Sequence, residues 1–375
     1  SNNTAVGYAS LSANTTGIDN VAVGWSALGA NTTGGDNVAV GKQALISNTT
    51  ASNNVAIGDR ALQANTTGIE NVAVGKDSMY ANTTSSRNTA IGLAALDAQT
   101  TGSGYNTAVG NNALTTNTSG AYNTAIGANA ITAITTGSQN TAVGYAAGQG
   151  LTGGSNFNVA IGDETLLTAG VKSYNTAIGS DALRANTTAS NNTAVGYNSL
   201  VANTTGTENT AVGSLALDAN TTGNYNNALG VGACGGNTTA IRNTGIGHEA
   251  LRTNTTGNNN TAVGYHALNL LTTGTENVAV GRDAADSITT GNYNTAIGSD
   301  ALNVATDADY NTCVGISSGN KITTGNNHTL IGQGAGGQLT TSNNCLILGY
   351  DAGQAGSPGG AITGSNEIAL GDENI

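Results

Sequence analysis

One five-residue motif, Asn-Thr/Val-Ala-Val/Ile-Gly, recurs from one end of the chain to the other and constrains the fold more than any other feature. There are 22 copies, and Asn20 to Gly24 is a typical one. The regular step between successive motif glycines is 17, as from Gly24 to Gly41, and three steps are longer, at 18, 18 and 22: Gly92 to Gly110, Gly144 to Gly162 and Gly349 to Gly371. A short period held over a whole chain is typical of a solenoid. We therefore expect a single elongated domain over residues 1–375, with residues 311–375 forming irregular C-terminal coils.

Composition limits the classes of function. The chain has 55 glycines and 9% charged residues, as disordered tracts often do, but disorder would not keep an apolar residue at one phase of every copy. A net charge of −12 with 10 Lys and Arg offers no basic surface, so no nucleic-acid partner is expected. No apolar run reaches the roughly 18 residues of a membrane span, so no membrane insertion is expected either. The chain begins and ends in mid-pattern, which is typical of a segment of a longer protein.

Each copy predicts one coil of chain. With the motif Asn as position 1, the consensus is Asn-Thr/Val-Ala-Val/Ile-Gly-x-x-Ala-Leu-x-Ala-Asn-Thr-Thr-Gly-x-x, which ends at position 17. Strand-forming residues bounded by Gly and Asn predict two short strands, at positions 2–4 and 8–11, with corners at position 5 and at Asn-Thr-Thr-Gly. The fold class is then all-β, a parallel β-solenoid of about 22 coils. Stacked motif Asn side chains are expected to form a hydrogen-bonded ladder.

Two positions change together near the C-terminal end. Ala at position 3 becomes larger in the same three copies in which Leu at position 9 becomes Gly: Cys313 with Gly319, Leu330 with Gly336, and Ile347 with Gly353. Compensation of volume predicts that positions 3 and 9 share one thin core. Gly148 and Ala285 depart from this rule because their copies keep a small residue at position 3. Cys234, Cys313 and Cys345 occupy three phases of the repeat, which predicts apolar filler instead of disulfides or a metal cluster.

If the position-3 Ala faces inward, the Val or Ile at position 4 faces outward in every coil. Such a stripe would exceed the few hundred Å² of apolar surface that a soluble monomer usually exposes, and a second copy of the chain is the simplest cover. Alternation also permits the reverse pleat, with Val and Ile inward and the Ala row outside. The candidate interface residues are Val6, Val23, Val40, Ile57, Val74, Ile91, Val109, Ile126, Val195, Val212, Val263 and Val280.

The motif resembles the head repeats of YadA-type trimeric autotransporter adhesins, whose hallmark is Asn-Ser-Val-Ala-Ile-Gly-x-x-Ser. The nearest segments are Asn71-Val72-Ala73-Val74-Gly75-Lys76-Asp77-Ser78 and Asn54-Val55-Ala56-Ile57-Gly58-Asp59-Arg60-Ala61. The resemblance implies a left-handed parallel β-roll assembled as a trimer. The arrays also resemble those of bacteriophage tail fibres, and residues 366–372 resemble the end of such an array before a C-terminal fibre domain. The adhesin head coil is shorter than this one. The adhesin ligand sites do not carry over, because they are not part of the motif that matches.

These features favour a non-enzymatic extracellular segment, the shaft or head of a phage tail fibre or of a trimeric surface adhesin. Its partners would be itself, as a homotrimer, and a host-surface glycan or protein receptor. A monomeric ice-binding solenoid and a structural filament subunit are the alternatives. Catalytic residues, metal sites and cofactors are not expected, because His248, His266 and His328 fall at three phases of the coil with no recurring carboxylate or nucleophile beside them.

Two rows of side chains are candidates for surface binding. Aromatic residues at position 17 would contact sugars, or alternatively cover the corner or pack between subunits: Tyr105, Tyr122, Tyr174, Tyr225, Tyr293 and Tyr310, with Phe157 at the same position. A threonine row in Asn-Thr-Thr-Gly is similar to the arrays of ice-binding proteins, although these threonines also suit a hydrogen-bonded corner: Thr15, Thr32, Thr66, Thr83, Thr204, Thr221 and Thr255.

Overall fold

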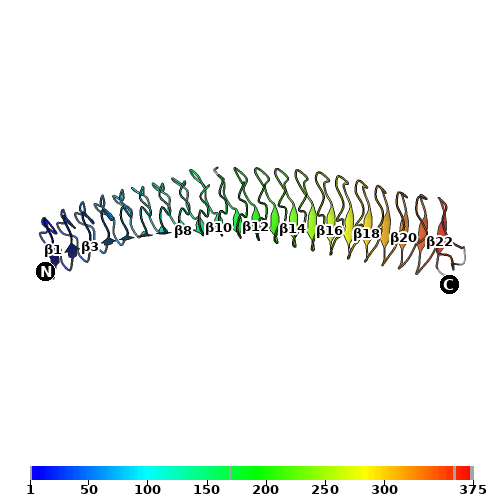
Figure 1. Ribbon diagram of the computed structural model, residues 1–375, viewed down its shortest axis with the longest axis horizontal. Coiled ribbons are helices and arrows are strands. Elements are labelled where there is room, and N and C mark those ends of the chain that lie inside the picture. Colours follow the sequence, from blue (N-terminus) through cyan, green and yellow to red (C-terminus); the bar gives the residue numbers. More distant parts are fainter. Residues whose placement is uncertain (1, 169, 358–359, 372–375) are drawn as a thin grey trace. The chain divides into compact units, whose positions relative to one another are not determined.

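The computed structural model describes residues 2–168, 170–357 and 360–371. It divides into two compact units, Ser1–Ser190 and Asn191–Ile375. Every coil described contributes one three-residue strand, and the described residues contain no α-helix (Figure 1). The strands of the first unit are β1 (Thr4–Val6), β2 (Val21–Val23), β3 (Val38–Val40), β4 (Val55–Ile57), β5 (Val72–Val74), β6 (Thr89–Ile91), β7 (Thr107–Val109), β8 (Thr124–Ile126), β9 (Thr141–Val143), β10 (Val159–Ile161) and β11 (Thr176–Ile178). Those of the second are β12 (Thr193–Val195), β13 (Thr210–Val212), β14 (Asn227–Leu229), β15 (Thr244–Ile246), β16 (Thr261–Val263), β17 (Val278–Val280), β18 (Thr295–Ile297), β19 (Thr312–Val314), β20 (Thr329–Ile331), β21 (Leu346–Leu348) and β22 (Ile368–Leu370).

Within each unit, successive strands pair in parallel and in register. Ala5 of β1 lies opposite Ala22 of β2, one repeat later. The register survives the longer copies, since Thr89 of β6 pairs with Thr107 of β7 although this copy is one residue longer than the regular ones. The extra residue of this copy therefore lies outside the strands. In the longest copy, residues 358–359 lie outside the described part. The prediction of an all-β parallel β-solenoid with a regular period of 17 is confirmed.

The second strand predicted for each coil, at positions 8–11, is wrong. This segment forms turns, and the residues at positions 7 and 9 have left-handed backbone, as Ser26 (φ 52°) and Leu28 (φ 53°) show. The reason is packing: Ala27 and Leu28 are both fully buried. Consecutive residues of a pleated strand point to opposite faces, so a strand could not bury both. The N–H of Leu28 still bonds the next coil, at the carbonyl of Ala44 (3.0 Å).

The core contains the residues expected at positions 3 and 9, joined by position 8. Except in β1 and β22, the middle residue of every described strand is buried, whereas its two neighbours are half-buried or exposed. The pleat therefore turns Ala inward, and the reverse pleat is excluded. Volume compensation is direct, because a β-carbon at Gly336 would lie 2.9 Å from Cδ1 of Leu330. The core at positions 3 and 9 is thus confirmed.

The two exceptions to this compensation have a neighbour at position 12. Gly148 faces Leu151, whose Cδ1 would lie 3.1 Å from a β-carbon on the glycine. Ala285 belongs to a coil in which the buried Ile288 stands at position 12, where half of the copies have Asn. Position 12 is therefore a further position, besides 3, 8 and 9, from which the interior can be filled.

The predicted ladder of motif Asn side chains is present and buried. Oδ1 of Asn20 accepts the N–H of Asn37 (3.0 Å) and its Nδ2 (3.1 Å), while Nδ2 of Asn20 donates to the carbonyl of Gly34 (2.9 Å). His328 continues the ladder, since its N–H donates to Oδ1 of Asn311 (3.0 Å). Burial lowers the pKa of His328, which favours the neutral ring.

A second buried ladder, at position 12, was missed by sequence reasoning. Nδ2 of Asn31 donates to Oδ1 of Asn14 (3.0 Å) and to the carbonyl of Gly34 (2.9 Å), the acceptor that Asn20 also uses. The signal was in the sequence, because Asn stands at position 12 in 11 copies, although it opens the motif more regularly, in 19. The corner interpretation of Asn-Thr-Thr-Gly concealed it.

Candidate functional site

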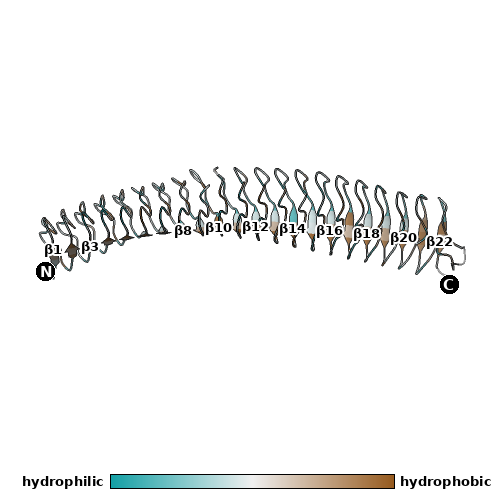
Figure 2. Ribbon diagram, in the orientation of Figure 1, coloured by the Kyte–Doolittle hydropathy of each residue, from teal (hydrophilic) through white to brown (hydrophobic). Residues whose placement is uncertain are grey.

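The outward face of the strands is formed by positions 2 and 4. All twelve predicted interface residues are half-buried or exposed, with Val6 58% and Ile57 40% exposed. Position 4 is aliphatic and position 2 is uncharged in all 22 copies. Figure 2 shows the brown, apolar colour mainly on the strands, whereas the loops are paler or teal. Each unit thus carries an uncharged strand face with a continuous aliphatic row.

The position-17 aromatics form stacked pairs on neighbouring coils. The pairs are Tyr105 with Tyr122, Phe157 with Tyr174, and Tyr293 with Tyr310, with ring centroids 4.9–5.1 Å apart and planes within 8°. All six predicted tyrosines are between 43% and 58% exposed. One face of each paired ring is therefore covered by the ring of the neighbouring coil.

Arginine covers a further face of two of these rings. The guanidinium of Arg87 lies 5.4 Å from the ring centre of Tyr105 and donates from Nη1 to its hydroxyl (2.7 Å). Arg242 lies over Tyr225 at 5.8 Å. Tyr105 is thus occupied by Arg87 and Tyr122, and the more exposed Tyr122, Tyr174 and Tyr310 offer better contact surfaces.

The predicted threonine row uses its hydroxyls within the chain. Thr66 Oγ1, for example, donates to the carbonyl of Thr83 (3.1 Å), and Thr83 Oγ1 to that of Thr100 (2.7 Å). The same bond to the next coil is made by Thr15, Thr32, Thr204, Thr221 and Thr255. These side chains tie the coils together, and their donors are not free for water or ice.

Charged side chains gather on another face, which positions 6, 7 and 10 form. We call it the variable face, because these positions differ most from copy to copy. Position-7 residues of successive coils stack above one another, as in the ion pair of Arg60 Nη2 with Asp77 Oδ1 (2.8 Å). Arg184 at position 10 reaches Glu164 (2.8 Å) and Asp181 (3.3 Å), both at position 7. These pairs are partly exposed and each contributes little to stability.

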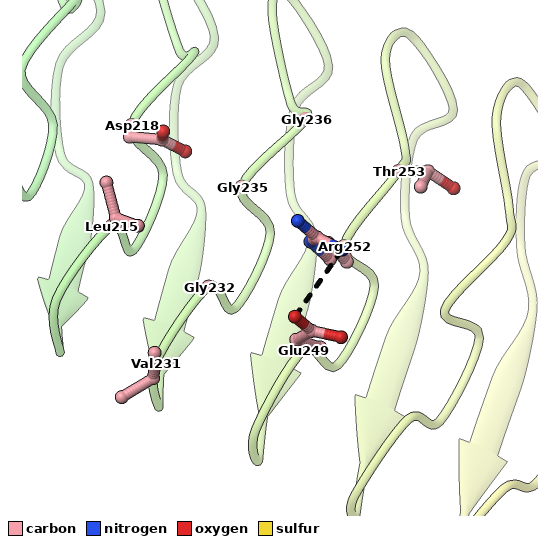
Figure 3. Close-up of a pocket in the computed structure, with 9 residues that line it drawn as sticks. All are labelled: Leu215, Asp218, Val231, Gly232, Gly235, Gly236, Glu249, Arg252 and Thr253. Atoms are coloured by element: carbon pink, nitrogen blue, oxygen red, sulfur yellow. Dashed lines mark ion pairs between the residues drawn. The ribbon is translucent and has the colours of Figure 1, made fainter.

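A hollow of about 540 Å³ opens on the variable face of the second unit (Figure 3). Its middle coil has glycine at positions 7, 10 and 11, namely Gly232, Gly235 and Gly236, so no side chain fills the space. The coils on either side contribute Leu215, Asp218, Glu249, Arg252 and Thr253, and Val231 stands at position 6. Figure 3 shows Glu249 beside Arg252, with 3.4 Å between Oε1 and Nη1. Burial raises the pKa of Asp218 at the far side.

Beside this hollow, two of the histidines that fall at different phases of the coil come together. His248 at position 6 and His266 at position 7 of the next coil have ring centres 6.0 Å apart. Nε2 of His266 lies 3.2 Å from Oε2 of Glu249, and its Nδ1 lies 3.7 Å from Oδ1 of Asp283. His266 therefore has a carboxylate on either side, from Glu249 and from Asp283, which sequence reasoning did not foresee. The spacing of the two histidines, one regular period plus one, was the overlooked signal.

The three cysteines and Lys172 are reactive groups that lie buried in the structure. Cys234 and Cys313 are fully buried, burial raises the pKa of both thiols to about 12, and all three cysteines are free, which agrees with apolar filler. Lys172 is buried at position 15, and its Nζ donates to the carbonyls of Thr168 (2.5 Å) and Asn186 (2.6 Å). Desolvation lowers the pKa of Lys172 to about 8. Sequence reasoning missed this buried cation.

Comparison of the chain with models of known protein families gave no match, and comparison with curated proteins gave none either. None of the described segments is a helix of the length and apolar character that a membrane crossing requires.

Proposed function

We propose that the chain is a non-enzymatic, extracellular fibre segment, the shaft or head of a phage tail fibre or of a trimeric surface adhesin, which attaches its bearer to a host or another surface. The supporting observation is the strand face. Position 4 is aliphatic and position 2 is uncharged in every copy, and the residues at both positions are half-buried or exposed in every described strand. A face of this extent exceeds what soluble monomers usually expose. Cover by another chain accounts for it.

The proposed cover is the same chain, in a homotrimer with left-handed coils like those of the adhesin heads. A second copy repeats its own aliphatic row at the same spacing, so it can match the first coil by coil. The net charge of −12 resides at other positions, because no charged residue occupies position 2 or 4. Charge repulsion between copies is therefore kept away from the contact.

The aromatic row is the proposed contact surface for a host-surface glycan or protein receptor. Tyr122, Tyr174 and Tyr310 are each at least 55% exposed, and a ring with one free face can stack on a sugar. Replacing Tyr122 and Tyr174 by Ser is expected to reduce binding to a glycan array, while Tyr8→Ser at position 6 leaves it unchanged. The ice-binding alternative has less support, because the threonine hydroxyls it requires donate to backbone carbonyls.

Multi-angle light scattering tests the assembly, with a mass of three chains as the expected result. Val195→Asp places a charge on the strand face and should yield folded monomers, because the cost falls on the contact between chains. Asn198→Asp is the matched control: it adds the same charge at position 7, on the variable face, and should remain trimeric. A monodisperse wild-type monomer would contradict the proposal, as would a Val195→Asp variant that stays trimeric.

A further inference from the structure

Outside the strand face, the described residues hold one place where two imidazoles and several carboxylates of three successive coils converge. His248 and Glu249 come from one coil, His266 from the next, and Asp283 and Asp286 from the third. One potential ligand atom from each of His248, Glu249 and His266 lies within 4.8 Å of the others. Because these residues stand on stacked coils, the register of the solenoid fixes their spacing.

We propose that His248, Glu249 and His266 bind one divalent transition-metal ion of the zinc type. Two imidazole nitrogens and a carboxylate oxygen are a ligand set that Zn²⁺ takes in proteins, with the fourth position left to water or another ligand. The separation of 3.2 Å between Nε2 of His266 and Oε2 of Glu249 is close to the edge of a tetrahedron with metal–ligand bonds of about 2.0–2.1 Å. An ion can therefore lie between these two atoms with little rearrangement.

The surroundings of the three ligands suit their orientation. Nδ1 of His266 faces Oδ1 of Asp283 at 3.7 Å, the carboxylate–histidine arrangement that usually directs Nε2 to a metal. Oε1 of Glu249 faces Arg252 at 3.4 Å, which leaves Oε2 for the ion. His248 is exposed and stacks on Tyr265, with ring centres 5.5 Å apart, so its imidazole can turn without disturbing the core.

Charge and an unsatisfied oxygen also favour a cation here. Glu249, Asp283 and Asp286 bring three carboxylates, against the two guanidiniums of Arg252 and Arg282. Oδ1 of Asp286 is buried without a hydrogen-bond partner. The remaining histidine, His328, lies buried in the Asn ladder and does not compete. Since Glu249 also lines the hollow of Figure 3, the ion would lie at the rim of that hollow.

Calorimetric titration of the full chain, without a histidine tag, with Zn²⁺ tests the site. The expected result is one ion per chain, and titration with Co²⁺ should give the intense visible absorption of four-coordinate cobalt. His248→Asn and Glu249→Gln should each weaken Zn²⁺ binding by at least about tenfold, and Asp283→Asn should weaken it by roughly 10–100-fold as an orienting residue. Circular dichroism of each variant checks that it remains folded.

Asp181→Asn is the matched control for Glu249→Gln. Asp181 occupies the same position 7 and pairs with an arginine three residues later, but no histidine lies beside it. It should leave Zn²⁺ binding unchanged. The proposal is overturned if wild type binds no Zn²⁺, or if His248→Asn binds like wild type. The latter result, together with loss of binding in Asp286→Asn, would move the site to the second group of His266, Asp283 and Asp286.

Discussion

The strand face and the variable face follow the same period and use it in opposite ways. At position 4 every copy keeps an aliphatic residue, and the register repeats one contact along each unit. At positions 6, 7 and 10 almost every copy differs, and the same register brings unlike residues such as Glu249 and His266 together. Repetition thus builds a surface for another repeating partner, whereas departure from repetition builds individual sites. Substitutions in the repeated framework should therefore cost far more than substitutions on the variable face.

The largest loss is expected at the position-5 glycine that separates the two faces. Gly41 has φ 138°, and a β-carbon there would lie 2.3 Å from the carbonyl oxygen of Gly58 in the next coil. Gly41→Val should lower the free energy of unfolding by at least about 4 kcal/mol, because backbone atoms cannot move aside. Gly232→Ala on the variable face is the control: it keeps a positive φ of 65°, but its β-carbon would lie at an ordinary contact distance of 3.5 Å from Cγ of Glu249, so about 1–2 kcal/mol is expected in urea denaturation. Equal losses would contradict the comparison.

Lys172 is a buried residue that departs from the repeat consensus. Replacing it should raise the free energy of unfolding, whereas replacing Gly41 should lower it. Because burial lowers its pKa from 10.5 to about 8, the unfolded chain binds more protons than the folded chain between those values. Wild-type stability should therefore rise with pH from about 8 to 10.5 and be lowest below about pH 8. Lys172→Met should remove this slope and stabilise the fold near pH 7 by up to about 3 kcal/mol.

Urea denaturation near pH 7 and near pH 10 measures that difference. The control is Lys42→Met at the exposed position 6, which should change stability little at either pH. A Lys172→Met variant that keeps the wild-type pH slope would show that another group causes it.

An intermediate loss is expected in the buried ladder. Oδ1 of Asn54 accepts the N–H of Asn71 (3.0 Å), and its Nδ2 donates to the carbonyl of Gly68 (2.9 Å). Asn54→Ala leaves that N–H buried without a partner, which should cost about 2 kcal/mol in thermal or urea unfolding. Asn111→Ala, at the exposed position 6, should be nearly neutral. If both variants unfold alike, the ladder does not stabilise the stack.

The smallest effect is expected for an ion pair on the variable face. Arg184 pairs with Glu164 at 2.8 Å, but its side chain is 48% exposed. Arg184→Ala should lower the free energy of unfolding by less than about 1 kcal/mol, and added salt should reduce the difference further. A loss as large as that of Asn54→Ala would mean that the variable face also holds the coils together.

Sequence reasoning succeeded where one residue type repeats at one phase. The motif Asn predicted the ladder, the exchange of Leu330 with Gly336 predicted the shared core, and both follow from volume or hydrogen bonding at a single position. It failed at positions 8–11, because alternation alone does not reveal that Ala27 and Leu28 both point inward. The left-handed backbone at Leu28 makes this possible. It also failed for His248 and His266, whose contact joins two different positions of neighbouring coils.

The sequence by itself determined the period, the parallel stacking of coils and the residues that fill the core. Each of these features recurs in the pattern of 22 copies, so a departure in one copy does not obscure it. Tertiary structure decided the left-handed backbone conformation of the Ala-Leu segment, the burial of Lys172, and which side chains meet on the variable face. The physical reason is that these features depend on single residues facing different residues across a coil boundary. Their meeting is set by backbone direction and packing, which no repeated pattern encodes.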